Sequence, residues 1–309
     1  MEPDTGKSRR LSSTGDTAVQ SLARRFGAIV FWLMLASAAL AAKANEQGQY
    51  LARIGGCIGC HSVEGQAPLA GGKAFKTPFG LFYSSNITPS LEHGIGRWSM
   101  DDFRRAMKRG IAPDGRAYYP VFPYRHFAGL SDQDLAALKN YLDQQPASEQ
   151  RNKSHQPNLM LRAEFLLQWW QVLYPPLAKE AALSRGQYLV DHLMHCGACH
   201  TARDPLGGFR DNASLRGATL ASGNPAPNLT PHEQGLLLWE PETIAEYLRT
   251  GKSEWGQNAR DEMREYIDTS SQYLNDADAK AVAEYLLSLP PASDFRACIK
   301  HGPRMHFCR

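Results

Sequence analysis

The sequence has little net charge and no apolar run that would cross a bilayer comfortably. Its 34 Lys and Arg against 31 Asp and Glu give a formal charge of +3. The whole excess lies in residues 1–44, so the remainder is neutral, and nothing indicates a nucleic-acid partner. The apolar segment at residues 26–42 is shorter than the about 20 residues that a spanning helix needs. No Ser/His/Asp arrangement, phosphate-binding loop or paired carboxylate stands out as a separate catalytic site.

The N-terminal segment has the features of an export signal. Residues 26–42 follow a pair of arginines and end in small residues, with Ala-x-Ala cleavage patterns at 42–44 and 39–41. This arrangement is typical of a secretory signal, here with a long charged leader. We predict that residues 1–44 are either cleaved or kept as an N-terminal anchor. Both forms place the rest of the chain in the periplasm, the second at the periplasmic side of the inner membrane.

Cysteine is scarce, and four of the six cysteines form two copies of Cys-x-x-Cys-His. Two thiols one helical turn apart suit thioether bonds to one haem, and the adjacent histidine suits the proximal side of its iron. A pair of zinc clusters is the alternative, but the further cysteine pairs that would complete tetrahedral sites are lacking. The sequence therefore predicts two covalently bound haem c groups. Their ligating residues are Cys57, Cys60 and His61, and Cys196, Cys199 and His200.

An internal repeat surrounds the two motifs. Gly-Gln-Tyr-Leu precedes each motif, at 48–51 and 186–189, and Asn-x-Thr-Pro follows each, at 86–89 and 228–231. The offset between matching positions drifts only from 138 to 144 along the chain. Such self-similarity predicts one fold used twice. A ligand position in one repeat can therefore be checked against the other.

The repeat also sets the expected architecture. We predict an all-α fold with two tandem class I cytochrome c-like domains, 45–147 and 184–296, joined by a helical linker over 148–183. Residues 71–89 are rich in Gly, Pro, Ser and Asn and predict a loop. The linker becomes apolar and aromatic before two prolines; it either packs across both domains or forms a docking surface for a partner protein or the membrane. Capping residues and apolar periodicity predict helices at residues 47–56, 99–109, 132–142 and 276–287.

A basic tail, residues 297–309, contains the two cysteines outside the motifs. Cys298 and Cys308 are expected to form a local disulfide if the protein lies in an oxidising compartment. A metal site that also uses His301 and His306 is the alternative.

The ligand on the far side of each iron sets its potential and reactivity. Met263 is the only methionine between the second motif and the tail, and its neighbours in the sequence are charged. Packing alone gives little reason for a methionine there. We therefore predict that Met263 is the sixth ligand of the second haem.

The first repeat departs from this pattern. The position 141 residues before Met263 is Phe122, which cannot bind iron. His126 is the nearest donor, with His93 as a weaker candidate, so we predict bis-histidine coordination of the first haem by His61 and His126. A second histidine lowers the potential and methionine raises it. Electrons are then expected to pass downhill from the first haem to the second.

The repeated blocks resemble the cytochrome c subunits of membrane-associated bacterial dehydrogenases, those that accompany alcohol, gluconate, aldehyde and isoquinoline-type enzymes. In many of these relatives methionine is an axial ligand where this chain has Phe122, and the region of Met263 looks like their second axial methionine. Members often carry a third haem domain and a C-terminal membrane-binding helix; with neither here, a relay subunit is expected. The most specific shared blocks are Thr77-Pro-Phe-Gly80, Gly94-Ile-Gly-Arg-Trp98, Tyr119-Pro-Val-Phe-Pro-Tyr124 and Cys196-Gly-Ala-Cys-His-Thr-Ala-Arg203.

The resemblance implies a periplasmic diheme cytochrome. It would accept electrons from the catalytic subunit of a dehydrogenase and pass them to a cytochrome or terminal oxidase, without being the catalyst itself. The alternative is a diheme enzyme, of the peroxidase or thiosulfate dehydrogenase type, in which one iron has an open or exchangeable position. The first repeat lacks the axial methionine, which leaves the alternative open. Binding of carbon monoxide by the reduced protein would favour it.

Overall fold

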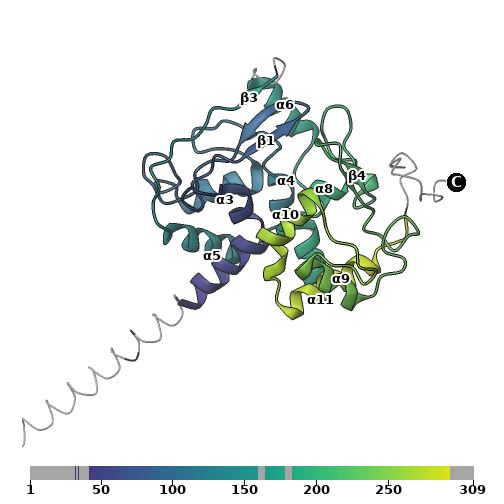
Figure 1. The fold of residues 1–309 in the computed structure, drawn as a ribbon. Coiled ribbons are helices and arrows are strands. Elements are labelled where there is room, and N and C mark those ends of the chain that lie inside the picture. Colours follow the sequence, from purple (N-terminus) through teal and green to yellow (C-terminus); the bar gives the residue numbers. More distant parts are fainter. Residues whose placement is uncertain (1–31, 33, 35–41, 159–163, 178–182, 293–309) are drawn as a thin grey trace, which may run out of the picture. The chain divides into compact units, whose positions relative to one another are not determined.

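Contacts divide the chain into a unit Met1–Asn45 and a unit Glu46–Arg309, and both motifs belong to the second unit (Figure 1). Most of the predicted N-terminal segment, and the tail with Cys298 and Cys308, lie outside the described residues. In the part of the chain that is described, no helix has the length and apolar character needed to cross a membrane. The computed structural model describes residues 32, 34, 42–158, 164–177 and 183–292.

The first repeat consists of short helices and a small sheet. Helical residues 46–54 lead into the first motif. The elements that follow are α2 (Cys57–His61), β1 (Ala74–Thr77), β2 (Gly80–Tyr83), α3 (Met100–Arg109), α4 (Tyr124–Phe127) and α5 (Asp132–Asp143). The connection to the second repeat contains β3 (Gln156–Pro157) and α6 (Glu164–Leu173).

The second repeat follows the same order of helices, as the internal repeat predicts. Its motif helix is α8, and α9 and α11 correspond to α3 and α5. Its elements are α7 (Arg185–Gln187), the π-helical η2 (Tyr188–Leu193), α8 (Gly197–His200), η3 (Asp211–Ala213), β4 (Ala218–Thr219), β5 (Pro225–Ala226), α9 (Pro241–Thr250), α10 (Asp261–Thr269), η4 (Ser271–Tyr273) and α11 (Asp276–Ser288).

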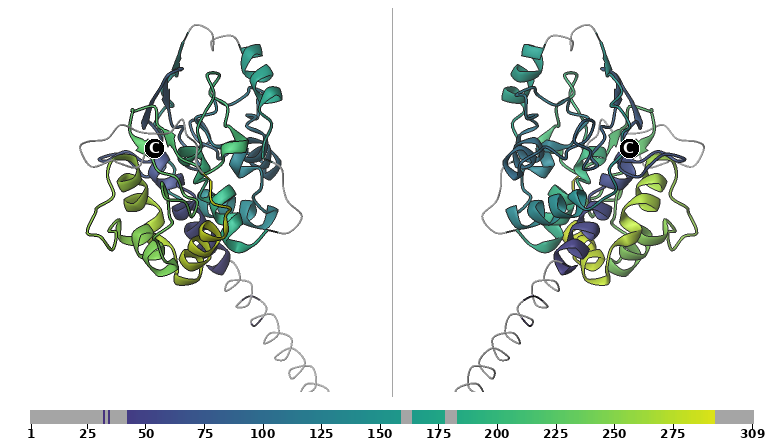
Figure 2. Two further views of the ribbon diagram at one scale, coloured as in Figure 1. Left: turned by 90° about the vertical axis from the view of Figure 1, so that its right-hand side faces the viewer. Right: turned by 90° about the vertical axis from the view of Figure 1, so that its left-hand side faces the viewer.

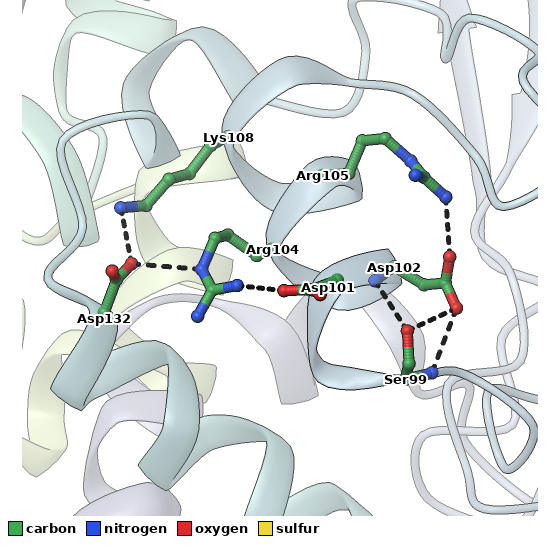
Figure 3. A network of polar contacts seen from close by, with 7 residues as sticks. All are labelled: Ser99, Asp101, Asp102, Arg104, Arg105, Lys108 and Asp132. Atoms are coloured by element: carbon green, nitrogen blue, oxygen red, sulfur yellow. Dashed lines mark hydrogen bonds and ion pairs between the residues drawn. The ribbon is translucent and has the colours of Figure 1, made fainter.

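Local sequence signals determine where the helices begin. The Ser99 hydroxyl accepts a hydrogen bond from the backbone N–H of Asp102 at 3.1 Å, and the Asp102 carboxylate accepts one from the Ser99 N–H. This capping box satisfies N–H groups that the first turn of α3 would leave unpaired. Asp132, in the first turn of α5, accepts from Lys108 at 2.9 Å and from Arg104 at 3.3 Å (Figure 3). These surface pairs join α3 to the start of α5.

The prediction of an all-α fold with a loop over residues 71–89 misses a small antiparallel sheet. Its strand order is β1-β2-β3, with Phe75 opposite Phe82 and Leu81 opposite Gln156. No strand is longer than four residues, too short to show the alternation that marks a strand. The pairing of β2 with β3 also joins segments far apart in the sequence. A local pattern therefore could not reveal it.

Both copies of Gly-Gln-Tyr-Leu begin with a glycine because two helices cross there at contact distance. A Cβ on Gly48 would lie 2.1 Å from the carbonyl oxygen of Ala137 on α5. A Cβ on Gly186 would lie 2.0 Å from the carbonyl oxygen of Ala281 on α11. No other side chain fits at such distances. The repeated glycine is thus explained by packing within each repeat.

Each repeat also supplies one half of a polar pair to the other. The hydroxyl of Tyr50, in the first repeat, donates to Asp278 at 2.7 Å. The hydroxyl of Tyr188, in the second repeat, donates to Asp134 at 2.5 Å. The tyrosines and the aspartates occupy corresponding positions of the two repeats. We call these contacts the reciprocal Tyr–Asp pairs. In both views of Figure 2 the purple helix that carries Tyr50 lies beside the yellow C-terminal helix.

The apolar core is continuous between the repeats. Leu51 and Leu138 of the first repeat and the corresponding Leu189 and Val282 of the second are almost fully buried, and all belong to one cluster. The two repeats therefore share a core, beyond the polar pairs that join them. Burial of this apolar surface is the main force that holds them together.

The linker helix α6 contacts both repeats, as the packing prediction for the linker requires. The Trp170 indole N–H donates to the carbonyl oxygen of Leu206 at 2.8 Å, and the Gln171 amide donates to that of Gly110 at 3.0 Å. The opposite face of α6 leaves large apolar side chains exposed, namely Phe165, Trp169, Val172 and Leu173. Nothing further identifies what would cover that face, so docking there stays a prediction.

We expect an Asp278→Ala variant to lose about 2–3 kcal/mol of unfolding free energy, the range for hydrogen bonds to a charged group. Asp278 is only 6 % exposed and accepts two bonds from the Arg185 guanidinium, at 2.8 and 2.7 Å, besides that from Tyr50. Urea unfolding followed by far-ultraviolet circular dichroism measures the loss.

Burial alone would raise the pKa of Asp278, but the bonds from Arg185 and Tyr50 outweigh burial and lower it. The contribution should therefore be present at neutral pH and lost on acidification through the folded-state pKa.

Asp134→Ala is the matched control. Its carboxylate accepts a hydrogen bond from the Tyr188 hydroxyl. Where Asp278 has Arg185, Asp134 has only the Gln47 amide, at 3.5 Å. A smaller loss, about 1.5 kcal/mol, is expected, because this carboxylate accepts the tyrosine bond but no pair of bonds from an arginine. Equal losses of unfolding free energy in the two variants would show that the bonds from Arg185 add nothing to stability.

Candidate haem sites

Each Cys-x-x-Cys-His motif forms a short helix whose last residue is the histidine. His61 ends α2, and its Nδ1 lies 2.7 Å from the carbonyl oxygen of Ser85. His200 ends α8, and its Nδ1 lies 2.8 Å from the carbonyl oxygen of Pro227. Ser85 and Pro227 are corresponding positions, 142 residues apart. A carbonyl oxygen can only accept, so Nδ1 carries the proton and Nε2 keeps the lone pair that binds a metal.

The surroundings of the two histidines also favour metal binding. Burial lowers the pKa of both His61 and His200. The neutral imidazole is the form that ligates iron. Identical anchoring by carbonyls in both repeats shows that the rings are oriented by the backbone and not by chance packing. The proximal ligands predicted from the sequence are therefore held in a geometry that suits the role.

The cysteines of each motif are placed for thioether chemistry. No disulfide within the described part of the chain joins any of the four motif cysteines, so both sulfurs of each motif can bond to one haem. A structural zinc site would need further cysteine or histidine ligands beside each motif. Among the described residues, the one cluster with metal-like spacing is Glu92, His93 and Glu149, and it contains no cysteine. The same cluster shows that His93, the weaker sixth-ligand candidate, lies beside two carboxylates.

Large apolar side chains occupy corresponding positions in the two repeats and belong to the core cluster beside the motifs. Trp98 corresponds to Trp239, and Phe103 on α3 to Ile244 on α9. These residues suit the walls of a haem site, because the macrocycle is flat and mostly apolar. When bound, the haem groups supply one-electron chemistry at iron; the protein fixes their position and potential.

Met263 lies on α10, where it is partly buried and packed against the core. Its charged neighbours in the sequence have partners elsewhere: Arg264 Nε donates to Asp268 at 2.8 Å, and Glu262 accepts from the Asn224 amide at 2.9 Å. The methionine therefore packs against the core while these neighbours contact other polar groups. This placement suits the predicted role of sixth ligand, which stays a prediction.

Phe122 belongs to an aromatic cluster of the first repeat. Its ring centroid lies 5.6 Å from that of Tyr118 and 5.7 Å from that of Phe127. An aromatic cluster thus fills the place in the first repeat that corresponds to Met263. No sulfur is supplied at this position.

The structure turns His126 toward the second repeat. Its Nδ1 lies 2.8 Å from the carbonyl oxygen of Asp191, and its ring centroid lies 5.1 Å from that of Phe209. A Cβ on Gly197, within the second motif, would lie 3.0 Å from the His126 ring. The residue also lines a cavity of about 460 Å³ whose other walls come mainly from the second repeat. Its buried Nε2 has no hydrogen-bond partner among the residues that the structure describes, and ligation of the first haem by His126 stays a prediction.

The docking of the two repeats determines the position of His126. Helix α4, which carries His126, packs against η2, the helix before the second motif. Burial first, and then the neighbouring His195, lower the pKa of His126 to about 3, so the ring is neutral. Proximity to Phe122 in the sequence suggested a ligand of the first haem, but docking decides which way the side chain faces.

We expect a Phe122→Met variant to gain a second methionine–iron absorption band in the ferric protein and a raised potential of the first haem. Phe122 is partly buried, and exchanges of similar volume cost less than about 1.5 kcal/mol. The far-red spectrum and a redox titration measure the change. In the companion variant His126→Ala, an unchanged low-spin spectrum would exclude His126 as a ligand, and conversion of one haem to high spin would support the prediction that His126 ligates it.

Comparison with known proteins places the chain in a family. The family model for cytochrome c matches residues 46–146 and again 183–290. A diheme cytochrome c-type protein of Cereibacter sphaeroides is 36 % identical over 79 % of this chain and 86 % of its own length.

Two further relatives are named as parts of dehydrogenases. The gluconate 2-dehydrogenase cytochrome c subunit of Pantoea cypripedii is 36 % identical over 83 % of this chain, and the fructose dehydrogenase cytochrome subunit of Gluconobacter japonicus is 37 % identical over 81 %. This chain spans only 64 % and 53 % of their lengths. With two family matches, each containing one anchored motif, the chain belongs to the cytochrome c family and carries two covalently bound haem c groups.

Proposed function

We propose that this protein carries electrons from the catalytic subunit of a periplasmic dehydrogenase to a downstream respiratory acceptor. The observation that carries the proposal is the pair of equivalent motifs, each with its histidine oriented by a backbone carbonyl, inside one compact unit. Two haem sites in one folded unit suit an electron relay. The names of the relatives, cytochrome subunits of gluconate, fructose and alcohol dehydrogenases, support a dehydrogenase as donor.

The residues of the chain would divide the work as follows. His61 and His200 would each ligate one of the two irons, and Met263 would supply a second ligand to the iron of the second haem. The first repeat offers Phe122 instead of a methionine, so its haem is the one of lower potential. Electrons would then enter at the first repeat and leave at the second. The apolar N-terminal segment and the need to attach haem after export support a periplasmic location.

Redox cycling of the purified holoprotein tests the relay. We expect the ferrous protein to pass one electron from each haem to ferric mitochondrial cytochrome c, used as a soluble acceptor, and to bind no carbon monoxide. Carbon monoxide binding by one haem, together with turnover of hydrogen peroxide, would favour the diheme enzyme instead. Phe122 is the observation that favours this second function, because a haem iron without a methionine ligand can have an exchangeable coordination position.

The donor is tested in membranes of a host that co-expresses this chain with a candidate catalytic subunit. Gluconate, fructose or an alcohol, the compounds in the relatives' names, is added and the ferrous α-band is followed. Reduction that requires both the substrate and the catalytic subunit would support the proposal. Absence of reduction with every subunit, in protein that a chemical reductant readily reduces, would contradict it.

A further inference from the structure

Helix α10 of the second repeat, which carries Met263, contacts the motif of the first repeat. A Cβ on Gly59, between the two cysteines of the first motif, would lie 2.4 Å from the hydroxyl oxygen of Thr269 on α10. The Lys73 ammonium donates to the carbonyl oxygen of Gly59 at 2.8 Å and pairs with Glu265, also on α10. One side of α10 therefore lies directly on the first motif.

Tyr266 lies on the same helix and reaches the segments before both motifs. Its hydroxyl is 3.2 Å from the carbonyl oxygen of Ile54 and 3.4 Å from that of Met194. Ile54 precedes Cys57 by three residues, and Met194 precedes Cys196 by two. The one proton of this hydroxyl is thus shared between backbone carbonyl oxygens on the approach to each haem.

The side chain of Tyr266 is partly buried between the repeats. Its ring centroid lies 6.4 Å from that of His195, the residue immediately before the second motif. Burial first, and then the nearby sulfurs of Cys196, Cys199 and Cys60, raise the pKa of the Tyr266 hydroxyl well above its usual value. Cysteines of both motifs are therefore near this hydroxyl, which stays protonated and can donate. Figure 1 shows α10 between the helices of the first repeat and α9 and α11.

This bridge occurs once, unlike the reciprocal Tyr–Asp pairs. At the offset of 141 that relates Met263 to Phe122, Tyr266 corresponds to Arg125. The Arg125 guanidinium donates to the carbonyl oxygen of Pro175, in the linker, at 2.7 Å. The contact with both approach segments is therefore not a by-product of the repeat. It is a feature of the second repeat alone.

We infer that Tyr266 is a positioning residue for electron exchange between the two haem groups. Its hydroxyl fixes the two approach segments relative to each other, and its ring fills the space between them. In the exchange, one iron is oxidised from ferrous to ferric while the other is reduced from ferric to ferrous. No proton moves and Tyr266 is not oxidised. The rate should depend on this residue because electron tunnelling falls steeply with the gap and with poorer packing across it. The inference rests on the two bound haems and not on the identity of the donor or acceptor.

The test uses the holoprotein with Tyr266→Phe and Tyr266→Leu. Flash photoreduction of the ferric protein gives the rate at which one electron equilibrates between the haems, and Soret circular dichroism reports their mutual orientation. We expect Tyr266→Leu to slow equilibration about tenfold or more, the scale of loss when reacting groups are misplaced, and to weaken the dichroic couplet. Tyr266→Phe keeps the ring and should give a smaller effect. Two haems per chain and the methionine–iron band should remain in both.

Tyr273→Leu is the matched control. This tyrosine lies seven residues further on, is 41 % exposed and stacks with Arg53, so its loss should leave rate and couplet unchanged. The inference would be overturned if Tyr266→Leu binds two haems and melts at a lower temperature but keeps the equilibration rate and the dichroic couplet. Tyr266 would then have a structural role only. If that variant does not fold, an unchanged rate and couplet in Tyr266→Phe overturns the inference. Failure to pass electrons to any acceptor, with normal equilibration, would contradict the proposed function and not this inference.

Discussion

A variant with both Cys57→Ala and Cys60→Ala is expected to carry one haem per chain instead of two. The thioether bonds to the first haem form only at these two sulfurs. The first repeat is small, and a domain of about 100 residues buries little apolar surface unless a further group adds to its core. The pyridine haemochrome spectrum and the intact mass measure the stoichiometry. Two covalently bound haems in this variant would refute the assignment of the first motif.

The same variant should also lower the stability of the second repeat. The core is continuous between the repeats, and Tyr50 supplies a hydrogen bond to Asp278 in the other half. Partial unfolding of the first repeat would remove that bond and expose part of the shared core. The matched variant Cys196→Ala with Cys199→Ala should show the converse. Independent melting of the remaining repeat in both variants would show that the interface contributes little.

A Met263→Leu variant is expected to lose the methionine–iron absorption band of the ferric protein completely and to lower the potential of the second haem. Methionine sulfur stabilises ferrous iron, and leucine offers no donor. The exchange nearly conserves volume, so the cost in stability should stay below about 1.5 kcal/mol. Far-red absorption and a potentiometric titration measure both effects.

Met107→Leu is the control for this substitution. Met107 lies on α3 of the first repeat, 8 % exposed in the core. The exchange should leave the band and both potentials unchanged. If the band survives Met263→Leu and disappears with Met107→Leu, the ligand has been assigned to the wrong repeat.

The helices could be predicted because their ends are marked locally. Ser131 accepts from the Asp134 N–H to begin α5, and Asn275 accepts from the Asp278 N–H to begin α11. Gly110, with φ of 63°, ends α3 in the left-handed region that glycine favours. Predicted bounds at 99–109, 132–142 and 276–287 accordingly agree with the structure to about one residue. The sheet was missed because β2 pairs with β3, whose residues lie about 75 positions further along the chain.

The motifs could be recognised in the sequence, but neither the carbonyl oxygens that anchor their histidines nor the way the repeats dock could be. Corresponding positions identify Tyr50 with Tyr188 and Asp134 with Asp278. They do not say that each tyrosine bonds to the aspartate of the other repeat. Nor do they show that the side chain of His126 lies at the interface with the second repeat. Tyr266 gave no signal in the sequence, because its two partners are backbone carbonyls.

The exchange of tyrosine and aspartate between halves has the form of an isologous contact, in which residue i meets residue j and j meets i. One copy that holds both side chains at these positions has what it needs to associate with an identical copy. When two such copies are joined in one polypeptide, the contact is kept. The two halves then no longer need the same sequence. The halves can then specialise, as Phe122 against Met263 and Arg125 against Tyr266 illustrate. Duplication and fusion of a self-associating ancestor would thus account for both the symmetry of the interface and the asymmetry of the two metal centres.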